Sequence, residues 1–287
     1  MEVFGKDLIL GQFRLSDHGM MLASFDSSGE SEDDTGISIS TIEEFIGGNP
    51  TPKYLGDKYT DKIKPKITFV KDPCTHGVNM YFSEKECRNI LRTLTGIRGY
   101  QWMKVVNDGN EDDIWFRSKI VSISSKRVGS NIVGLILDME CDSPFGWSAE
   151  TLIDLNFEAN KPIRIFSNTD DLYNYIYPVV TITFSFEGDS TKDFTLENIT
   201  DNRKSEIKNV RNGEKITIDS KNEVITSEID GVKNDEDTTS PHIHKLLLND
   251  FTNMNWIRLL PDANELVTNM NARITFRYRV PRKVVLL

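Results

Sequence analysis

Strict alternation of apolar and polar side chains is the clearest pattern along this chain. In three stretches the apolar residues occupy every second position, as they do when one face of a β-strand is buried. These apolar positions are Val133, Leu135, Leu137, Met139 and Cys141, then Val180, Ile182, Phe184 and Phe186, and finally Ile274, Phe276, Tyr278 and Val280. The alternation predicts strands of antiparallel sheets whose other face meets solvent.

Shorter runs repeat this alternation between residues that favour turns. The runs lie at 114–124, 214–219 and 224–229. Asn, Asp and Gly residues favour the left-handed backbone of tight hairpins. They lie between the runs at 107–110, 212–213 and 230–231. The chain is therefore predicted to be mainly β.

One segment departs from this pattern and predicts a helix over about 84–95. Ser83 followed by Glu86 forms a capping box, in which each side chain satisfies a backbone N–H that the first helical turn leaves free. Apolar residues then recur at helical spacing before Gly96, at Cys87, Ile90, Leu91 and Leu94. We expect this apolar stripe to pack against a sheet.

Two polar stretches and one turn organise the chain. Residues 27–35 and 230–240 are dominated by acidic and other polar side chains, which is typical of solvated loops. At 142–147 the sequence Asp-Ser-Pro-Phe-Gly-Trp ends a long predicted strand in a turn. We therefore expect an N-terminal domain at 1–144 and a C-terminal domain at 145–287.

Composition narrows the class of protein. A chain of 287 residues that is 38% hydrophobic can bury a sizeable core without cross-links. Its 34 Lys and Arg residues against 44 Asp and Glu residues give a net charge of -10, which repels the phosphates of nucleic acid. The sequence offers neither the apolar core of a secretion signal nor a membrane-spanning stretch of ~20 residues. We expect no nucleic-acid or membrane partner.

The cysteines indicate folding in a reducing compartment. They are three in number, widely spaced, and fit neither a disulfide framework nor a paired metal motif. They are Cys74, Cys87 and Cys141.

Metal-binding patterns are present only in part. His242 and His244 would point to one face of a strand and could share a zinc ion, as in one family of zinc peptidoglycan peptidases. That family also needs a His-x-x-x-Asp element, but Leu22 follows four places after His18, and Met80 four places after His76. Since the third ligand is missing, we interpret the pair as two histidines of a loop.

A calcium-loop pattern fails in the same way. Asp108, Asn110 and Asp112 have the spacing of its first ligands. Asp113 stands where the turn needs Gly, and Lys119 where a bidentate Glu is required. No phosphate-binding loop, nucleophile elbow or zinc-protease motif occurs. We therefore predict no catalytic, cofactor-binding or metal-binding residue, and no cofactor.

One basic cluster and the tryptophans are further candidates for binding. Arg273, Arg277 and Arg279 share a face of the last predicted strand and precede Arg282 and Lys283. We interpret them as cross-strand partners of acidic residues, with an acidic neighbouring molecule as the alternative. Tryptophans next to aliphatic strand residues are interpreted as core rather than as sugar-stacking platforms. They are Trp102, Trp115, Trp147 and Trp256.

Several segments in order resemble the distal tail proteins (Dit) of long-tailed siphophages and prophages. The most telling is an outgoing strand at 137–141 that ends in the Cys-Asp-Ser-Pro-aromatic turn at 141–145. The others are an N-terminal strand and turn at 13–20, the helix and its exit at 91–102, and a hairpin strand at 115–120. The likeness covers nearly the whole chain.

This resemblance implies a fold for each domain. The N-terminal domain would be a β-sandwich or split barrel with one α-helix, and the C-terminal domain a galectin-like β-sandwich. The segments that can supply the strands of the second domain are 178–187, 192–199, 213–219 and 273–280. The residues that bind sugar in galectins have no matching set here, so the resemblance implies a shared framework more than a lectin activity.

The resemblance also implies a structural role without catalysis. In the family, the N-terminal domains form a homohexameric ring at the distal end of the virion tail, in the baseplate. The ring is a hub that joins the tail tube protein to the tail-tip protein and, in some members, to tape-measure and receptor-binding proteins. Folding would take place in the cytoplasm of the host bacterium.

Two other functions remain as alternatives. In one, the C-terminal domain is an adhesin for carbohydrates of the host cell wall. In the other, His242 and His244 belong to a zinc-dependent peptidoglycan hydrolase.

Overall fold

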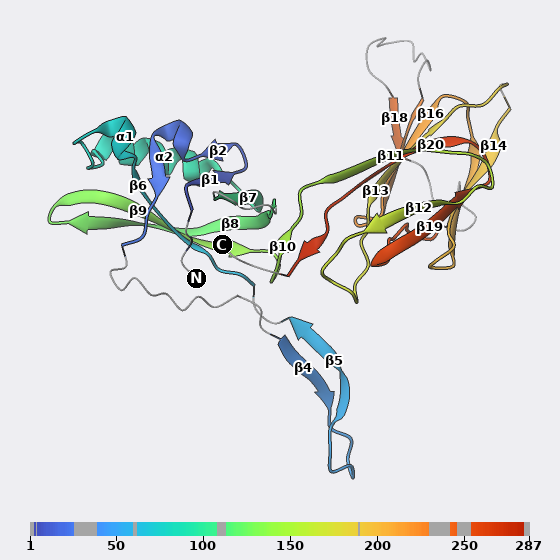
Figure 1. The fold of residues 1–287 in the computed structure, drawn as a ribbon, viewed down its shortest axis with the longest axis horizontal. Helices are drawn as coiled ribbons and strands as arrows, with labels where there is room; N and C mark the ends of the chain where they lie inside the picture. The colour runs from blue at the N-terminus through green and yellow to red at the C-terminus, as the bar shows by residue number, and fades with distance from the viewer. Residues whose placement is uncertain are drawn as a thin grey trace. The chain divides into compact units, whose positions relative to one another are not determined.

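The computed structural model describes most of the chain as two compact units. The described residues are 3, 5–25, 39–59, 62–107, 113–188, 190–229, 242–245 and 254–283, with the backbone only at 229 and 242–245. The first unit comprises Met1–Ser148 and Arg282–Leu287, and the second comprises Ala149–Pro281 (Figure 1). The predicted loops at 27–35 and 230–240, and the turns at 108–110 and 230–231, lie outside these residues.

The first unit contains strands and short helices. Its helical elements are η1 (Ser16–His18), α1 (Pro73–His76) and α2 (Glu84–Gly96). Its strands are β1 (Asp7–Leu10), β2 (Phe13–Arg14), β3 (Met20–Leu22), β4 (Ile39–Glu44), β5 (Lys53–Tyr59), β6 (Lys66–Lys71), β7 (Gln101–Val106), β8 (Phe116–Val128), β9 (Asn131–Cys141) and β10 (Gly146–Trp147). Across the described ranges, no helix is long and apolar enough to cross a bilayer.

Seven of these strands form one antiparallel sheet. Their order is β2-β1-β7-β8-β9-β6-β3. Strands β1 and β3 are separated in this order but also contact each other, so the sheet curls around its core. Fully buried side chains from several strands fill this core, among them Leu8, Phe69, Met103 and Leu137.

Helix α2 confirms the predicted capping box. The Ser83 hydroxyl accepts a hydrogen bond from the Glu86 backbone N–H, and the Glu86 carboxylate accepts one from the Ser83 backbone N–H. Cys87 and Leu94 are buried as expected, whereas Leu91 is exposed. The helix ends at Gly96, within one residue of the predicted end, with Ile97 as its C-cap.

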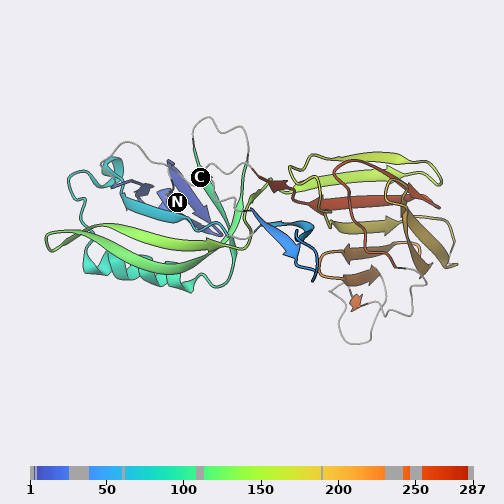
Figure 2. The ribbon, with the colours of Figure 1, turned by 90° about the horizontal axis from the view of Figure 1, so that it is seen from below.

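The second unit is a sandwich of two sheets. The larger sheet has the order β11-β20-β13-β16-β17-β18, which Figure 2 shows face on, and the smaller has the order β12-β19-β14-β15. The bounds are β11 (Thr151–Phe157), β12 (Ile163–Ser167), β13 (Val179–Phe184), β14 (Lys192–Asn198), β15 (Arg203–Val210), β16 (Glu214–Asp219), β17 (Val224–Ile229), β18 (His242–Lys245), β19 (Asp262–Thr268), β20 (Ala272–Tyr278) and β21 (Pro281–Arg282).

The three strongest alternating stretches are confirmed as strands β9, β13 and β20. Their apolar residues from Leu135 to Cys141, from Val180 to Phe184 and from Ile274 to Val280 are buried. Phe186 is half-buried beyond the end of β13, and Val133 is half-buried within β9. Most elements of the described chain are strands, so the chain is mainly β, as the alternation predicts.

Candidate assembly site

Strands β4 and β5 form a hairpin whose side chains are mostly exposed, and Tyr59 at its base packs edge-on against Phe145. The two strands pair only with each other, and none of their residues is buried. Among the described residues, the exposed large apolar side chains of this hairpin are Ile39, Ile42, Phe45, Ile46, Tyr54 and Leu55. An isolated two-stranded hairpin is only marginally stable in water. This apolar surface is therefore the strongest candidate in the molecule for contact with another protein.

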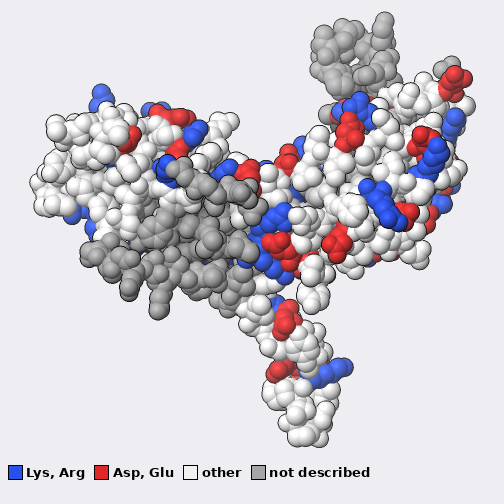
Figure 3. Space-filling view, viewed as in Figure 1, with Lys and Arg blue, Asp and Glu red and all other residues white. Residues whose placement is uncertain are grey.

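A charge pair and a bulge define the register and twist of the hairpin. Glu44 lies opposite Lys53, which places opposite charges across the two strands. A bulge between Ile42 and Glu43 shifts the register and increases the local twist. Its end, residues 45–52, contains no charged residue, and Figure 3 shows it as an uncharged tip. The hairpin thus presents Phe45 and Ile46 at an uncharged end, with the other apolar side chains along its two strands.

The N-terminal turn at 13–20, part of the family resemblance, is held to the sheet by hydrogen bonds to Asp7. Asp7 on β1 is buried, and its carboxylate accepts hydrogen bonds from Arg14 Nε at 2.6 Å, Ser16 Oγ at 2.7 Å and the Ser16 backbone N–H at 3.1 Å. Burial alone would raise the pKa of this carboxyl, but the hydrogen bonds from Arg14 and Ser16 outweigh it and lower the pKa. The turn at 13–20 is therefore fixed to the sheet.

The turn after β9 is equally constrained. Ser143 Oγ donates to the Phe145 carbonyl at 2.7 Å, and the backbones of Trp115 and Trp147 exchange hydrogen bonds of 2.8 and 2.7 Å. A Cβ on Gly146 would lie 2.5 Å from Ile114 Cγ2, so only glycine fits there. The Cys-Asp-Ser-Pro-aromatic turn is thus a close-packed feature of the first unit.

A surface cluster around Glu140 ties distant segments together. Its carboxylate accepts hydrogen bonds from Tyr100 Oη at 3.0 Å and Lys62 Nζ at 3.3 Å, and pairs with Lys119 Nζ at 3.4 Å. The hydrogen bonds from Tyr100 and the two lysines lower the pKa of Glu140. Lys119, which breaks the calcium-loop pattern, therefore has a structural partner in β9.

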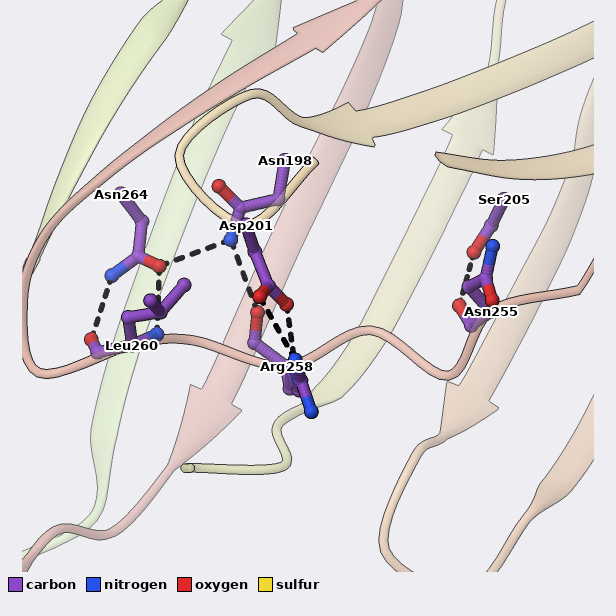
Figure 4. Close-up of polar contacts among 7 residues, drawn as sticks. All are labelled: Asn198, Asp201, Ser205, Asn255, Arg258, Leu260 and Asn264. Atoms are coloured by element: carbon purple, nitrogen blue, oxygen red, sulfur yellow. Dashed lines mark hydrogen bonds and ion pairs between the residues drawn. The ribbon is translucent and has the colours of Figure 1, made fainter. Parts of the chain in front are cut away.

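A network of amides, one ion pair and backbone groups fixes the segment 254–260 in the second unit (Figure 4). Asn264 is fully buried and accepts hydrogen bonds from the Leu260 backbone N–H at 2.8 Å and from Asn198 Nδ2 at 3.0 Å. Arg258 holds Asp201 through two hydrogen bonds of 2.6 and 2.9 Å. The sequence analysis missed this network because its members lie 60 residues or so apart in the chain.

The predicted candidates for chemistry occupy structural positions. Arg273 pairs with Asp154 through Nε–O distances of 3.0 Å, which confirms cross-strand pairing for this residue. The hydrogen bond from Arg273 lowers the pKa of Asp154. All four tryptophans are half-buried. Cys74 is exposed, Cys87 and Cys141 are buried, and all three are free thiols.

The side chains of the incomplete metal patterns lie largely outside the part of the chain that the structure describes. His242 and His244 lie on β18 rather than in a loop, because β18 pairs with β17 at His244 opposite Ser227. Their side chains lie outside the described residues, as do Asp108, Asn110 and Asp112. Among the residues that the structure describes, no group of three or more His, Cys, Asp or Glu side chains could hold a metal ion.

Comparisons with known proteins identify the family. One family model, described as a phage tail protein N-terminal domain, matches residues 4–143, and a second, described as a phage tail C-terminal domain, matches residues 145–278. Together they span nearly the whole chain, which therefore belongs to this family of phage tail proteins. No curated protein matches it.

Solved structures give the particular fold. The crystal structure of the Dit protein (gp 19.1) of phage SPP1, described as a paradigm of the hub adsorption apparatus in phages that infect Gram-positive hosts, matches with a TM-score of 0.59 and 14% identity. The match covers 95% of this chain and 98% of that chain. The resemblance to the distal tail proteins is thus confirmed at the level of fold.

Chains from the baseplate of phage p2 share this fold. In the activated baseplate with Ca, the TM-score is 0.52 at 8% identity, with 98% of this chain and 99% of that chain covered. In the same baseplate with Sr, the TM-score is 0.55 at 8% identity, with 98% and 100% covered.

Proposed function

We propose that this chain is a structural hub of the phage baseplate. In this role it forms a homohexameric ring at the distal end of the tail and joins the tail tube to the tail-tip protein and to receptor-binding proteins. It carries no catalytic activity and folds in the host cytoplasm before assembly. The family of phage tail proteins and the Dit-like fold of both units support this role.

The exposed apolar side chains of the β4–β5 hairpin are the observation that supports self-assembly. Burying a large apolar side chain contributes about 1.5–3 kcal/mol, which the isolated chain forgoes at Phe45 and its neighbours. A head-to-tail contact whose rotation closes makes a ring, in which each hairpin is covered by the next copy. Closure also covers exposed strand edges that would otherwise promote aggregation.

Light scattering on the purified full chain tests this proposal. We expect a concentration-dependent assembly whose limit is six copies, visible as rings in electron micrographs. Replacing Phe45 and Leu55 with Ser removes side chains that are 79% and 52% exposed, so the fold persists. The midpoint of association should rise by about tenfold or more, as expected when about 1.4 kcal/mol of apolar contact is lost.

The matched control is Leu152→Ser, because Leu152 is 65% exposed on β11 of the second unit. The midpoint of association of this variant should equal that of the unmodified protein. A chain that remains monomeric at high concentration, alone and with tail tube and tail-tip proteins, would refute the proposal.

A tyrosine-rich loop in the second unit favours the adhesin as a second candidate. Tyr173 is 89% exposed, and the ring of Tyr175 lies 3.5 Å from the guanidinium of Arg258. Buried Asp171 fixes the loop by accepting hydrogen bonds from the Tyr173 backbone N–H at 3.3 Å and from Asn174 Nδ2 at 2.6 Å. Rigid, exposed aromatic rings with polar neighbours lose little entropy on binding.

Sedimentation with purified host cell walls tests this candidate. The full chain should co-sediment with the walls, and Tyr173→Ser should reduce the bound fraction severalfold while Leu152→Ser leaves it unchanged. Equal binding by both variants would exclude the loop as the contact.

A further inference from the structure

The first unit contains a cavity, lined by both polar and apolar side chains, that the proposed assembly does not use. Its volume is about 140 Å³, enough for a group of several heavy atoms. It lies between β6, α2 and the two short helical elements. Its lining residues are His18, Met20, Lys71, His76, Phe82, Glu86, Asn89 and Ile90. The functional side chains come from separate segments of the chain, so no sequence motif marks the site.

Lys71 gives the cavity a buried positive charge. The residue is 2% exposed, and its ammonium donates to Glu86 Oε1 at 2.7 Å and lies 5.5 Å from the centre of the Phe82 ring. An ammonium group carries three N–H donors, of which this ion pair uses one. The other Glu86 oxygen is already engaged by the Ser83 hydroxyl and backbone N–H, at 2.7 and 2.8 Å. Lys71 therefore retains donor capacity at the cavity.

Two histidines are positioned at the same cavity by specific packing. A Cβ on Gly19 would lie only 2.6 Å from His76 Nε2, so the absence of a side chain at Gly19 makes room for the imidazole. Gly19 also has a φ of +63°, which disfavours other residues. His18 stacks on Phe13 with ring centres 4.8 Å apart. Both imidazoles therefore lie beside the cavity that they help to line.

We infer that this cavity binds a small oxyanion, namely a carboxylate or phosphate group. Lys71 supplies a buried charge, and the imidazole N–H groups of His18 and His76, with the Asn89 amide, supply further donors. Glu86 balances the charge of Lys71, so we expect the donated hydrogen bonds rather than a net charge to select the oxyanion.

Equilibrium dialysis of the full chain against labelled inorganic phosphate tests the inference. We expect saturable binding of one phosphate per chain. Lys71→Met should weaken binding more than tenfold, and Lys85→Met, on the exposed face of α2, should leave it unchanged.

A second variant guards against misfolding of the first. His76→Leu removes the imidazole donors of a half-buried side chain at the cavity opening and should weaken phosphate binding severalfold while the fold is retained. The inference is overturned if phosphate binding does not saturate, or if Lys71→Met and Lys85→Met bind it equally in folded protein.

Sedimentation velocity at pH 5.5 distinguishes the two sources of the oxyanion. If the occupant is a carboxylate side chain of another copy, phosphate should dissociate the assembly, whereas chloride at equal ionic strength should not. If the occupant is a free anion, the assembly is unaffected while dialysis still shows binding. Both results support an oxyanion site, and they leave the proposed hub function to be decided by its own test.

Discussion

At the scale of single residues, Glu86 links helix capping to the charge of Lys71. Hydrogen bonds from Lys71 and Ser83 lower the pKa of Glu86 to about 2, from an ordinary value of 4.5. A depressed pKa in the folded state means that the unfolded chain binds more protons between these values. The stabilisation by Glu86 is therefore complete above about pH 4.5 and disappears as the pH falls towards 2.

Replacing Glu86 with Gln should show this window directly. We expect a loss of about 1–2 kcal/mol in the free energy of unfolding at pH 7, less than the 3–5 kcal/mol of a fully buried pair because the Glu86 side chain is 40% exposed. The difference from the unmodified protein should shrink between pH 4.5 and 2, as measured by urea unfolding. Glu84→Gln, on the exposed first turn of α2, is the control and should show no such window.

The three cysteines should differ sharply in reactivity. Burial raises the pKa of the Cys141 thiol to about 12 and also raises that of Cys87. Since the thiolate is the reactive form, alkylation by iodoacetamide at pH 8 should modify exposed Cys74 first and leave Cys141 unmodified in folded protein. Mass spectrometry of digested protein measures this, with urea-unfolded protein as the control in which all three react. Early modification of Cys141 would contradict its burial.

At the scale of elements, the segment 254–260 depends on one arginine. Arg258 forms a bidentate pair with Asp201 and stacks on Tyr175, two contacts for which a planar guanidinium is required. Arg258→Lys keeps the charge but loses this geometry, so we expect a loss of about 1.5–3 kcal/mol, the range for hydrogen bonds to charged groups. Hydrogen exchange should rise at 254–260 in particular. Arg277→Lys, on the exposed face of β20, should change neither quantity.

The same network explains which strands could be predicted from the sequence. Alternation predicted β9, β13 and β20 because apolar side chains fill every inward position there. Strands β15 and β19 escaped prediction because Ser205 and Asn264 face inward, where backbone and amide groups satisfy them. Their burial breaks the apolar pattern that identifies a strand.

The β4–β5 hairpin could not be predicted from the sequence for the opposite reason. Alternation marks a strand that buries one face. Among the described residues, β4 and β5 bury neither face, so no alternation marks them in the sequence. The oxyanion cavity combines His18, Lys71 and His76, which only the folded sheet brings together. The capping box of α2, by contrast, is local in sequence and could be predicted in full.

At the scale of the whole molecule, the two units have separate cores. The first core includes Leu137 and the second includes Phe276, and both side chains are fully buried. Each core is closed by the sheets of its own unit, so we expect the two units to unfold separately.

Independent cores predict two separable unfolding transitions in the full chain. Leu137→Ala and Phe276→Ala each delete buried apolar volume and should each cost about 3–5 kcal/mol. For units of this size, that loss lowers the midpoint of the affected transition by roughly 10 °C. Scanning calorimetry should show that each substitution shifts one transition and leaves the other in place, and that the double variant shifts both additively, as expected for distant sites. If either substitution moved both transitions equally, the chain would unfold as a single cooperative body, and the separate cores would have to be abandoned as the basis of its stability.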